Sequence, residues 1–164
     1  MIRGFCGIKD SHAYRYVSHR TEQCRKGENA MGEQENVRAI EEFYAAFGRG
    51  DVQFLLNALA EDVDWRHPRP DDIPWGGNRR GRDEVSKFFA AVAQTLDVEK
   101  FEPREFVAKD DRVLVFGYEQ MRVKSNGRTY GVEFTHAWTL QGGKIIRFQE
   151  YTDTATLVEA LRGS

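Results

Sequence analysis

The sequence predicts an α+β domain in which helices come first and a run of antiparallel strands follows. Apolar residues recur at helical spacing in the first half of the domain and at every second position in the second half. The turns between the later strands carry Asn-Gly or a Gly pair, as in hairpins. We expect one domain, from about Glu33 to the C-terminus, whose curved sheet encloses a mostly apolar pocket with a few ionisable side chains.

Three helices are expected before the main strands, and a short helix at 155–161 closes the chain. The first helix spans 34–48 and ends at Gly48 and Gly50, because glycine readily leaves the helical conformation. Asp51 is a natural N-cap for the second helix, and the third begins near Arg82. Their apolar faces carry, in order, Val37, Ile40, Phe43, Tyr44 and Phe47; Val52, Leu55, Leu56 and Leu59; and Val85, Phe88, Phe89, Val92 and Leu96.

Five strands are expected, of which the first, at 63–67, is short. The segment after it is interpreted as a loop, because it contains three prolines and the Gly76-Gly77 pair. Pro103 weakens the second strand and favours an edge position for it. Ser125-Asn126-Gly127 predicts a tight hairpin between the third and fourth strands, and Gly142-Gly143 predicts the next turn. The later strands are expected at 101–109, 112–124, 128–141 and 144–153.

Residues 1–30 differ from the rest, since they show no helical or strand period and are rich in Arg, Lys, Gly, Ser and His. We expect a disordered N-terminal extension there and a domain over 31–164. Cys6, His12, His19 and Cys24 lie in this stretch, but their spacing matches no standard zinc pattern, so no metal site is expected. A further hypothesis is that Met31 is the native start of the protein.

Charge and composition exclude several classes of function. The net charge of −2 does not suggest a basic surface for nucleic acid. No apolar run is long enough for a membrane span, and no signal peptide is visible. The domain contains no cysteine, which fits a reducing compartment, so a cytoplasmic location is expected.

Alternation along the strands places one ionisable side chain near the middle of each apolar face. Successive side chains of a strand point to opposite faces of the sheet, so residues can be sorted by position. The four ionisable residues are His67, Glu119, His136 and Glu150. The apolar faces are Val63, Trp65 and His67; Val113, Val115, Gly117, Glu119, Met121 and Val123; Val132, Phe134, His136, Trp138 and Leu140; and Ile146, Phe148, Glu150 and Thr152.

A carboxylate on an apolar face needs a partner or an altered pKa. Two Glu and two His that converge in one pocket supply partners for each other, and such a cluster is typical of proton-transfer chemistry or of a site that orients a polar ligand. Two plainer readings remain open. Each His can be an ordinary core residue, and each Glu can lie at a strand end in water or pair with Arg.

The segments "FYAAFGRGD", "VDWRHP", "GRDEV" and "HAWTLQGGKIIRFQEYTDT", in this order, resemble the nuclear transport factor 2-like superfamily. More narrowly, residues 34–162 resemble its SnoaL-like, ketosteroid-isomerase-like branch. The resemblance implies a cone: a strongly bent antiparallel sheet wrapped around a pocket that helices close. The sorted faces would then line the cone. It also implies a homodimer, since many members are dimers.

The catalytic residues of two relatives map onto the sorted positions. Ketosteroid isomerase uses an Asp base, with a Tyr and a protonated Asp as oxyanion donors. In this chain the resemblance puts these at His67, at Phe43 with Tyr44 one place off, and at His136. The two catalytic Asp positions of limonene-epoxide hydrolase fall on Glu119 and Glu150, its bridging Arg on Gly117, and its water-positioning Tyr and Asn on Trp65 and His67. Neither catalytic set is complete, whereas the SnoaL cyclases need only one acidic residue as acid or base.

We therefore expect a small-molecule protein that performs acid–base chemistry without a cofactor or metal, as isomerisation, cyclisation or hydration of an apolar substrate with one or two oxygens. Glu119 or His67 is expected as base, and His136 or Glu150 as acid or polarising group. The pocket is expected to be shaped by Trp65, Phe43, Tyr44, Phe134, Trp138 and Phe148. The alternatives are a non-catalytic ligand-binding module and a dimeric assembly module. In the latter, Leu114, Phe116 and Tyr118 on the outer face of the sheet would form the contact.

Overall fold

The structure is a computed structural model and describes residues 32–67 and 73–162. The expected N-terminal extension, with Cys6, His12, His19, Cys24 and Met31, lies outside the described residues. Within the described ranges, no helix is long and apolar enough to cross a membrane.

In the described part of the chain, six strands form one sheet in the order β2-β1-β6-β5-β4-β3. All neighbouring strands are antiparallel except β1 and β6, which run parallel. The helices are α1 (Glu33–Gly48), α2 (Val52–Ala58), α3 (Arg82–Thr95) and α4 (Thr154–Arg162). The strands are β1 (Leu59–His67), β2 (Gly77–Arg80), β3 (Leu96–Lys109), β4 (Arg112–Val123), β5 (Thr129–Gln141) and β6 (Lys144–Thr152). This α+β arrangement confirms the predicted fold class.

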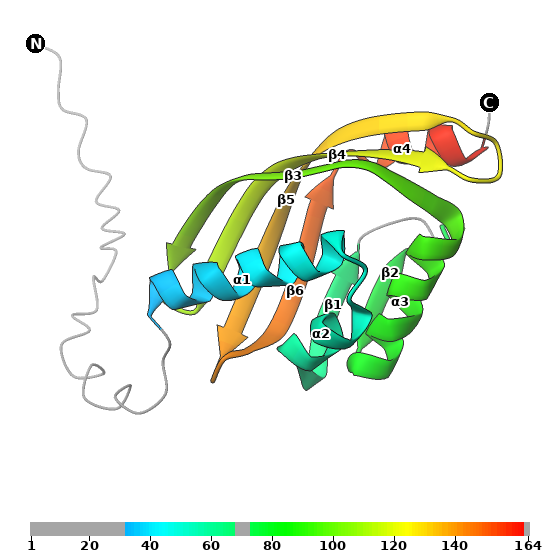
Figure 1. The fold of residues 1–164 in the computed structure, drawn as a ribbon. Coiled ribbons are helices and arrows are strands. Elements are labelled where there is room, and N and C mark those ends of the chain that lie inside the picture. Colours follow the sequence, from blue (N-terminus) through cyan, green and yellow to red (C-terminus); the bar gives the residue numbers. More distant parts are fainter. Residues whose placement is uncertain (1–31, 68–72, 163–164) are drawn as a thin grey trace, which may run out of the picture.

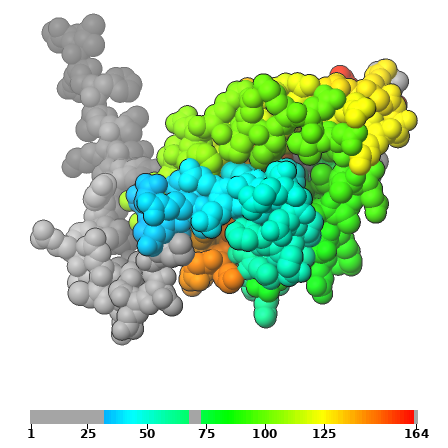
Figure 2. Space-filling view, in the orientation of Figure 1, coloured from blue at the N-terminus to red at the C-terminus, as the bar shows by residue number. Residues whose placement is uncertain are grey.

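The long strands curl over α1, which lies across the concave face of the sheet (Figure 1). Helices α2 and α3 lie beside β1, and α4 packs against β5 near the hairpin that joins β4 and β5. In the space-filling view, the side chains of α1, α2, α3 and β3 meet and close the molecule on this side (Figure 2). The core therefore lies between the sheet and the helices, where the sorted apolar faces point.

The first two helices begin as the sequence predicts. Glu35 reaches back to accept a hydrogen bond from the backbone N–H of Gly32, at 2.9 Å, which satisfies one of the donors left open at the start of α1. Asp51 is the N-cap of α2 and accepts from the backbone N–H of Phe54 at 3.0 Å. Ile40, Phe43 and other apolar residues of α1 are buried, as their spacing indicated.

Two leucines assigned to helices belong to strands. Leu59 and Leu96 continue the apolar spacing of α2 and α3, but each has extended backbone angles and is the first residue of the following strand. The carbonyl of Leu59 accepts hydrogen bonds from Nε and Nη2 of Arg82, at 2.9 and 2.6 Å. The periodic pattern extended one position too far because a buried strand start and a helix face both place a leucine in the core.

The segment interpreted as a loop contains a short strand. β2 pairs with β1 in antiparallel register, with Arg79 opposite Trp65 and Gly77 opposite His67. Its sequence, Gly-Asn-Arg-Arg, shows no apolar alternation, because the strand is at the sheet edge and largely exposed. The pattern therefore gave no signal for it.

β3 lies at the opposite edge of the sheet, as Pro103 suggested. The pairing of β3 with β4 shifts register between Pro103 and Glu105, since proline has no N–H to donate to the ladder. The strand is longer than expected because it begins at Leu96.

The faces of β1, β4 and β5 point as alternation predicts, but the start of β6 does not. Ile145, rather than Ile146, is buried in the core. The register between β5 and β6 shifts at this point, so that Arg147 pairs with Thr139 while Ile145 pairs with Leu140. One extra residue in β6 means that the residues before it point to the opposite face from the one that alternation predicts. Simple alternation cannot detect such a bulge.

Gly117 on β4 is required by close packing. A Cβ at this position would overlap the ring of Phe134 on β5 and the carbonyl oxygen of Glu102 on β3. We predict that Gly117→Ala lowers the free energy of unfolding by about 1–3 kcal/mol, the usual cost of overpacking. Urea unfolding followed by circular dichroism measures the change.

Gly48→Ala is the matched control, because a Cβ there would meet no atom within 4 Å. It exchanges the same two residue types at the end of α1, where alanine is the better helix former. Equal stability of the Gly117 and Gly48 variants would contradict the packing argument.

Candidate functional site

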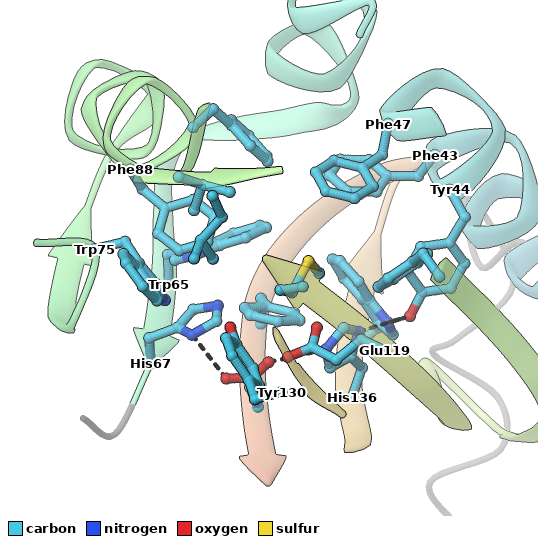
Figure 3. Close-up of a pocket in the computed structure, with 18 residues that line it drawn as sticks. Phe43, Tyr44, Phe47, Trp65, His67, Trp75, Phe88, Glu119, Tyr130 and His136 are labelled. Carbon is cyan, nitrogen blue, oxygen red and sulfur yellow. Dashed lines mark hydrogen bonds and ion pairs between the residues drawn. The ribbon is translucent and has the colours of Figure 1, made fainter. Parts of the chain in front are cut away.

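All four ionisable residues singled out from the sequence line one cavity between the sheet and helices α1 and α3. The cavity has a volume of about 70 Å³. This is well below the roughly 300–1,000 Å³ of sites for drug-sized ligands, so the space suits only a small molecule. His67, Glu119 and His136 point toward the same part of the cavity (Figure 3).

Glu150 holds the centre of this group with its side chain only 2% exposed. Its Oε2 lies 2.8 Å from Nδ1 of His67, and its Oε1 lies 3.4 Å from Nε2 of His136. The two histidines reach it from the strands on either side of β6. His136 is directly opposite Glu150 on β5, and His67 ends the parallel strand β1. Glu150 therefore bridges both imidazoles.

The hydrogen-bonded chain continues from His136 into α1. The Tyr44 hydroxyl lies 2.9 Å from Nδ1 of His136 and accepts a hydrogen bond from Nε1–H of Trp138 at 3.0 Å. An indole N–H can only donate, so the Tyr44 proton is available for Nδ1 of His136. In neutral His136 the ring proton is then on Nε2, which faces Glu150.

Tyr44 stays protonated near neutral pH. Burial raises the pKa of the Tyr44 hydroxyl well above its ordinary range, the hydrogen bond from Trp138 opposes this rise, and the negative charge of Glu150 adds to it. A hydroxyl that does not ionise can donate to His136 whenever that imidazole is neutral. In that state the hydrogen bonds run in one direction, from Trp138 through Tyr44 and His136 to Glu150.

Glu119 supplies a second carboxyl group to the same cavity. It is buried on β4, opposite Val132 of β5 and Phe101 of β3. Figure 3 shows its side chain beside those of Tyr130 and His136. The cavity thus combines two carboxyl groups and two imidazoles, which can accept, hold and return protons. Among residues 32–67 and 73–162, no group of three or more His, Cys, Asp or Glu is arranged to hold a metal ion.

Comparison with known proteins agrees with the resemblance inferred from the sequence. The family model of the SnoaL-like domain matches residues 40–148. The chain belongs to the SnoaL-like family. Comparison with curated proteins gives no match.

Solved structures support the same assignment. A nuclear transport factor 2-like protein from Burkholderia xenovorans is 38% identical, over 79% of this chain and 98% of that chain, with a TM-score of 0.73. The protein TerC, co-crystallised with polyporic acid, is 32% identical over 78% and 98% of the two chains, with a TM-score of 0.71. An epoxide hydrolase of M. tuberculosis, similar to limonene-epoxide hydrolase, shares the fold at 17% identity over 80% and 92%, with a TM-score of 0.64.

Most aromatic residues expected in the pocket of this SnoaL-like domain line the cavity. These are Phe43, Tyr44, Trp65, Trp138 and Phe148. Phe134 is the exception, because its ring is not part of the lining. It stacks on His136 at a centroid distance of 4.2 Å and fills the space beside Gly117. Phe134 therefore supports His136.

Sequence reasoning missed several residues of the lining. Trp75 is buried although it lies in the segment interpreted as a loop, and a tryptophan between Pro74 and a Gly pair is a signal that this segment returns to the core. Tyr130 shares the inward face of β5 with Val132 and was missed because the sorting began two residues too late, at Val132. The remaining lining residues are Phe47, Phe88, Phe89, Val92, Leu96, Phe101 and Met121.

We predict that Tyr44→Phe destabilises the protein by about 1–3 kcal/mol, because it leaves Nε1–H of Trp138 and Nδ1 of His136 without their shared partner. Thermal or urea unfolding measures the loss. Tyr151→Phe is the control, since Tyr151 is 59% exposed and its replacement should change stability by less than about 0.5 kcal/mol. If the two variants are equally stable, the Tyr44 hydroxyl does not hold the network together.

Proposed function

We propose that this protein catalyses acid–base chemistry without a cofactor on a small apolar substrate that carries oxygen. The reaction class is isomerisation, cyclisation or hydration. The observation that supports it most is the Glu150 carboxylate, buried in an aromatic cavity and 2.8 Å from Nδ1 of His67.

Glu150 sets the tautomer of His67 in this proposal. A carboxylate 2.8 Å from Nδ1 accepts the proton of that nitrogen, so Nε2 of neutral His67 carries the accepting lone pair. When His67 takes a proton from a substrate carbon, Glu150 stabilises the imidazolium that forms. The imidazolium then returns the proton to a different atom, which completes an isomerisation. Alternatively, the carbanion adds to a second carbonyl carbon of the substrate, the C=O π bond breaks, and the imidazolium protonates the resulting alkoxide, which completes a cyclisation.

Glu119 and His136 are proposed as the second acid–base pair. Both line the cavity with Glu150, and His136 is held by Tyr44 and by the ring of Phe134. A carboxyl group and an imidazole in one cavity let one group remove a proton while the other donates one. TerC has been crystallised with polyporic acid, and by analogy we propose that this cavity also takes an organic molecule.

A binding module without turnover is the alternative, and one observation favours it. Glu150, His67, His136, Tyr44 and Trp138 already satisfy each other through hydrogen bonds. Such a closed network needs no proton transfer, and it can hold a ligand in place without turnover. Tight ligand binding with no proton exchange would support this second function.

We predict that Glu150→Gln and Glu119→Gln each slow proton removal by about 100- to 10,000-fold while the fold is kept. The assay follows the exchange of α-protons for deuterium in a panel of small neutral ketones by NMR. Glu133→Gln is the matched control, because Glu133 lies on the outer face of β5 with its side chain 70% exposed.

Circular dichroism of the three variants separates a lost fold from lost chemistry. If the wild-type protein exchanges the α-protons of the ketones no faster than buffer does, the catalytic proposal is contradicted and the binding module remains as the proposed function. Unchanged exchange in Glu119→Gln alone would remove Glu119 from the mechanism.

We further propose that the protein forms a homodimer through the outer face of the sheet. Leu114 and Phe116 on β4 are 37% and 40% exposed, and Leu114 pairs with the exposed Val107 of β3. These neighbours make an apolar patch on one face, as expected for a self-association surface. Tyr118 is half-buried, with Arg104 against its ring, and lies at the border of the patch.

We predict that Phe116→Lys shifts the protein from dimer to monomer, because a charge is placed in the middle of the apolar contact. Analytical ultracentrifugation measures the mass. Val52→Lys is the control, since Val52 is similarly exposed, at 41%, but lies on α2. A dimer that survives Phe116→Lys, or a wild-type monomer, would refute this interface.

A further inference from the structure

One tryptophan of the cavity has a polar atom that no side chain or backbone group satisfies. Among the described residues, Nε1 of Trp65 is a fully buried side-chain nitrogen with no hydrogen-bond partner. Such unpaired donors are rare in native proteins, because a buried N–H loses its hydrogen bonds to water without replacement. Trp65 is 2% exposed and lines the cavity, so the indole that carries this donor is part of the candidate site.

The surrounding rings hold the Trp65 indole in place. It stacks on Phe148 at a centroid distance of 4.1 Å and packs against Phe88 and Phe89 at 5.4 and 5.7 Å. Trp138, in the same cavity, has its N–H satisfied by Tyr44. The missing partner is therefore particular to Trp65 and does not result from a general lack of acceptors around the cavity.

We propose that Nε1–H of Trp65 donates a hydrogen bond to an uncharged oxygen of the ligand, a carbonyl or a hydroxyl on or next to a ring. In the described part of the chain, the lining includes Glu119 and Glu150 but neither Lys nor Arg, and its two histidines already lie against Glu150, so the site favours an uncharged ligand. The ligand class is thus a small neutral aromatic or cyclic ketone or alcohol. This inference rests on the proposed function only in taking the same cavity as the ligand site.

The place of Trp65 fits a role beside the proposed base. Trp65 and His67 are on the same face of β1, with ring centroids 6.4 Å apart and ring planes within 24°. A ligand one ring in size can reach both. A hydrogen bond from Trp65 to a carbonyl oxygen withdraws electrons and makes the neighbouring C–H more acidic. The proton then moves from that carbon to Nε2 of His67, and the enolate oxygen keeps the hydrogen bond to Trp65.

A weak contact with an aromatic ring is the competing explanation for the unpaired N–H. The rings of Phe89 and Trp138 lie edge-on to Trp65, at interplanar angles of 65° and 72°. An N–H that points at a ring face is partly satisfied without any ligand. In that case a ligand oxygen gains nothing from Trp65, and ketone and hydrocarbon should bind alike.

The experiment compares acetophenone with ethylbenzene, which has a CH₂ group in place of the carbonyl. Both are titrated into the isotope-labelled full chain, and the indole N–H signals of its three tryptophans are followed by NMR. We expect acetophenone to bind about tenfold more tightly, the effect of one satisfied donor, and to move the Trp65 indole proton downfield. The Trp138 signal is the internal control, because that N–H already donates to Tyr44.

Trp65→Phe assigns the signal and removes the donor, and the preference for acetophenone should disappear in this variant. If the variant does not fold, Trp75→Phe and Trp138→Phe assign the other two indole signals, and the wild-type signal that remains is that of Trp65. Equal affinities for the two probes, a Trp65 proton that does not move, or no binding of acetophenone up to its solubility would overturn the proposal. The readout is binding, so a ketone preference without proton exchange would support Trp65 while the catalytic function fails. Proton exchange without a preference for acetophenone would support the catalytic function while the proposal for Trp65 fails.

Discussion

A carboxylate that is almost fully buried in an aromatic wall is stable only where hydrogen-bond donors reach it. Glu150 meets this requirement through His67 and His136, which come from the two strands beside β6. The parallel pairing of β1 with β6 is what brings His67 close. Breaking one member of such a group leaves a buried charge or dipole unpaired, so the network constrains the strands, the register and α1 together.

The aromatic lining and the polar network depend on each other. Rings stacked around Glu150, such as Phe148 beside Trp65 and Phe134 on His136, keep water away from the hydrogen bonds. In a site from which water is excluded, each hydrogen bond is electrostatically stronger and each unsatisfied group is more costly. This is why the unpaired N–H of Trp65 is informative: the same environment that strengthens the network makes that donor unfavourable until a ligand supplies an acceptor.

This chain has Gly117 where the resemblance places the bridging Arg of limonene-epoxide hydrolase, and the packing around Gly117 explains the difference. By resemblance, limonene-epoxide hydrolase has a bridging Arg at this position, between two carboxylates. Here the ring of Phe134 occupies the space that a side chain of residue 117 would need, and it stacks on His136. The imidazole of His136 lies between Glu150 and Tyr44 in the network. Family membership fixes the fold, and the side chains in the cavity decide the chemistry.

The sequence by itself determined that helices precede a run of antiparallel strands, and it singled out His67, Glu119, His136 and Glu150, because alternation is a local property of the backbone. The curvature of the sheet was implied by the resemblance to the family. The sequence could not place β2, because an exposed edge strand has no apolar alternation. It also missed the bulge that buries Ile145 in place of Ile146, and the burial of Trp75, because an extra residue and a loop that returns to the core leave no periodic signal. Only the tertiary structure decided which residues are partners. The hydrogen bond between Tyr44 and His136, for example, joins residues that are 92 positions apart in the sequence. It forms because the sheet curls over α1.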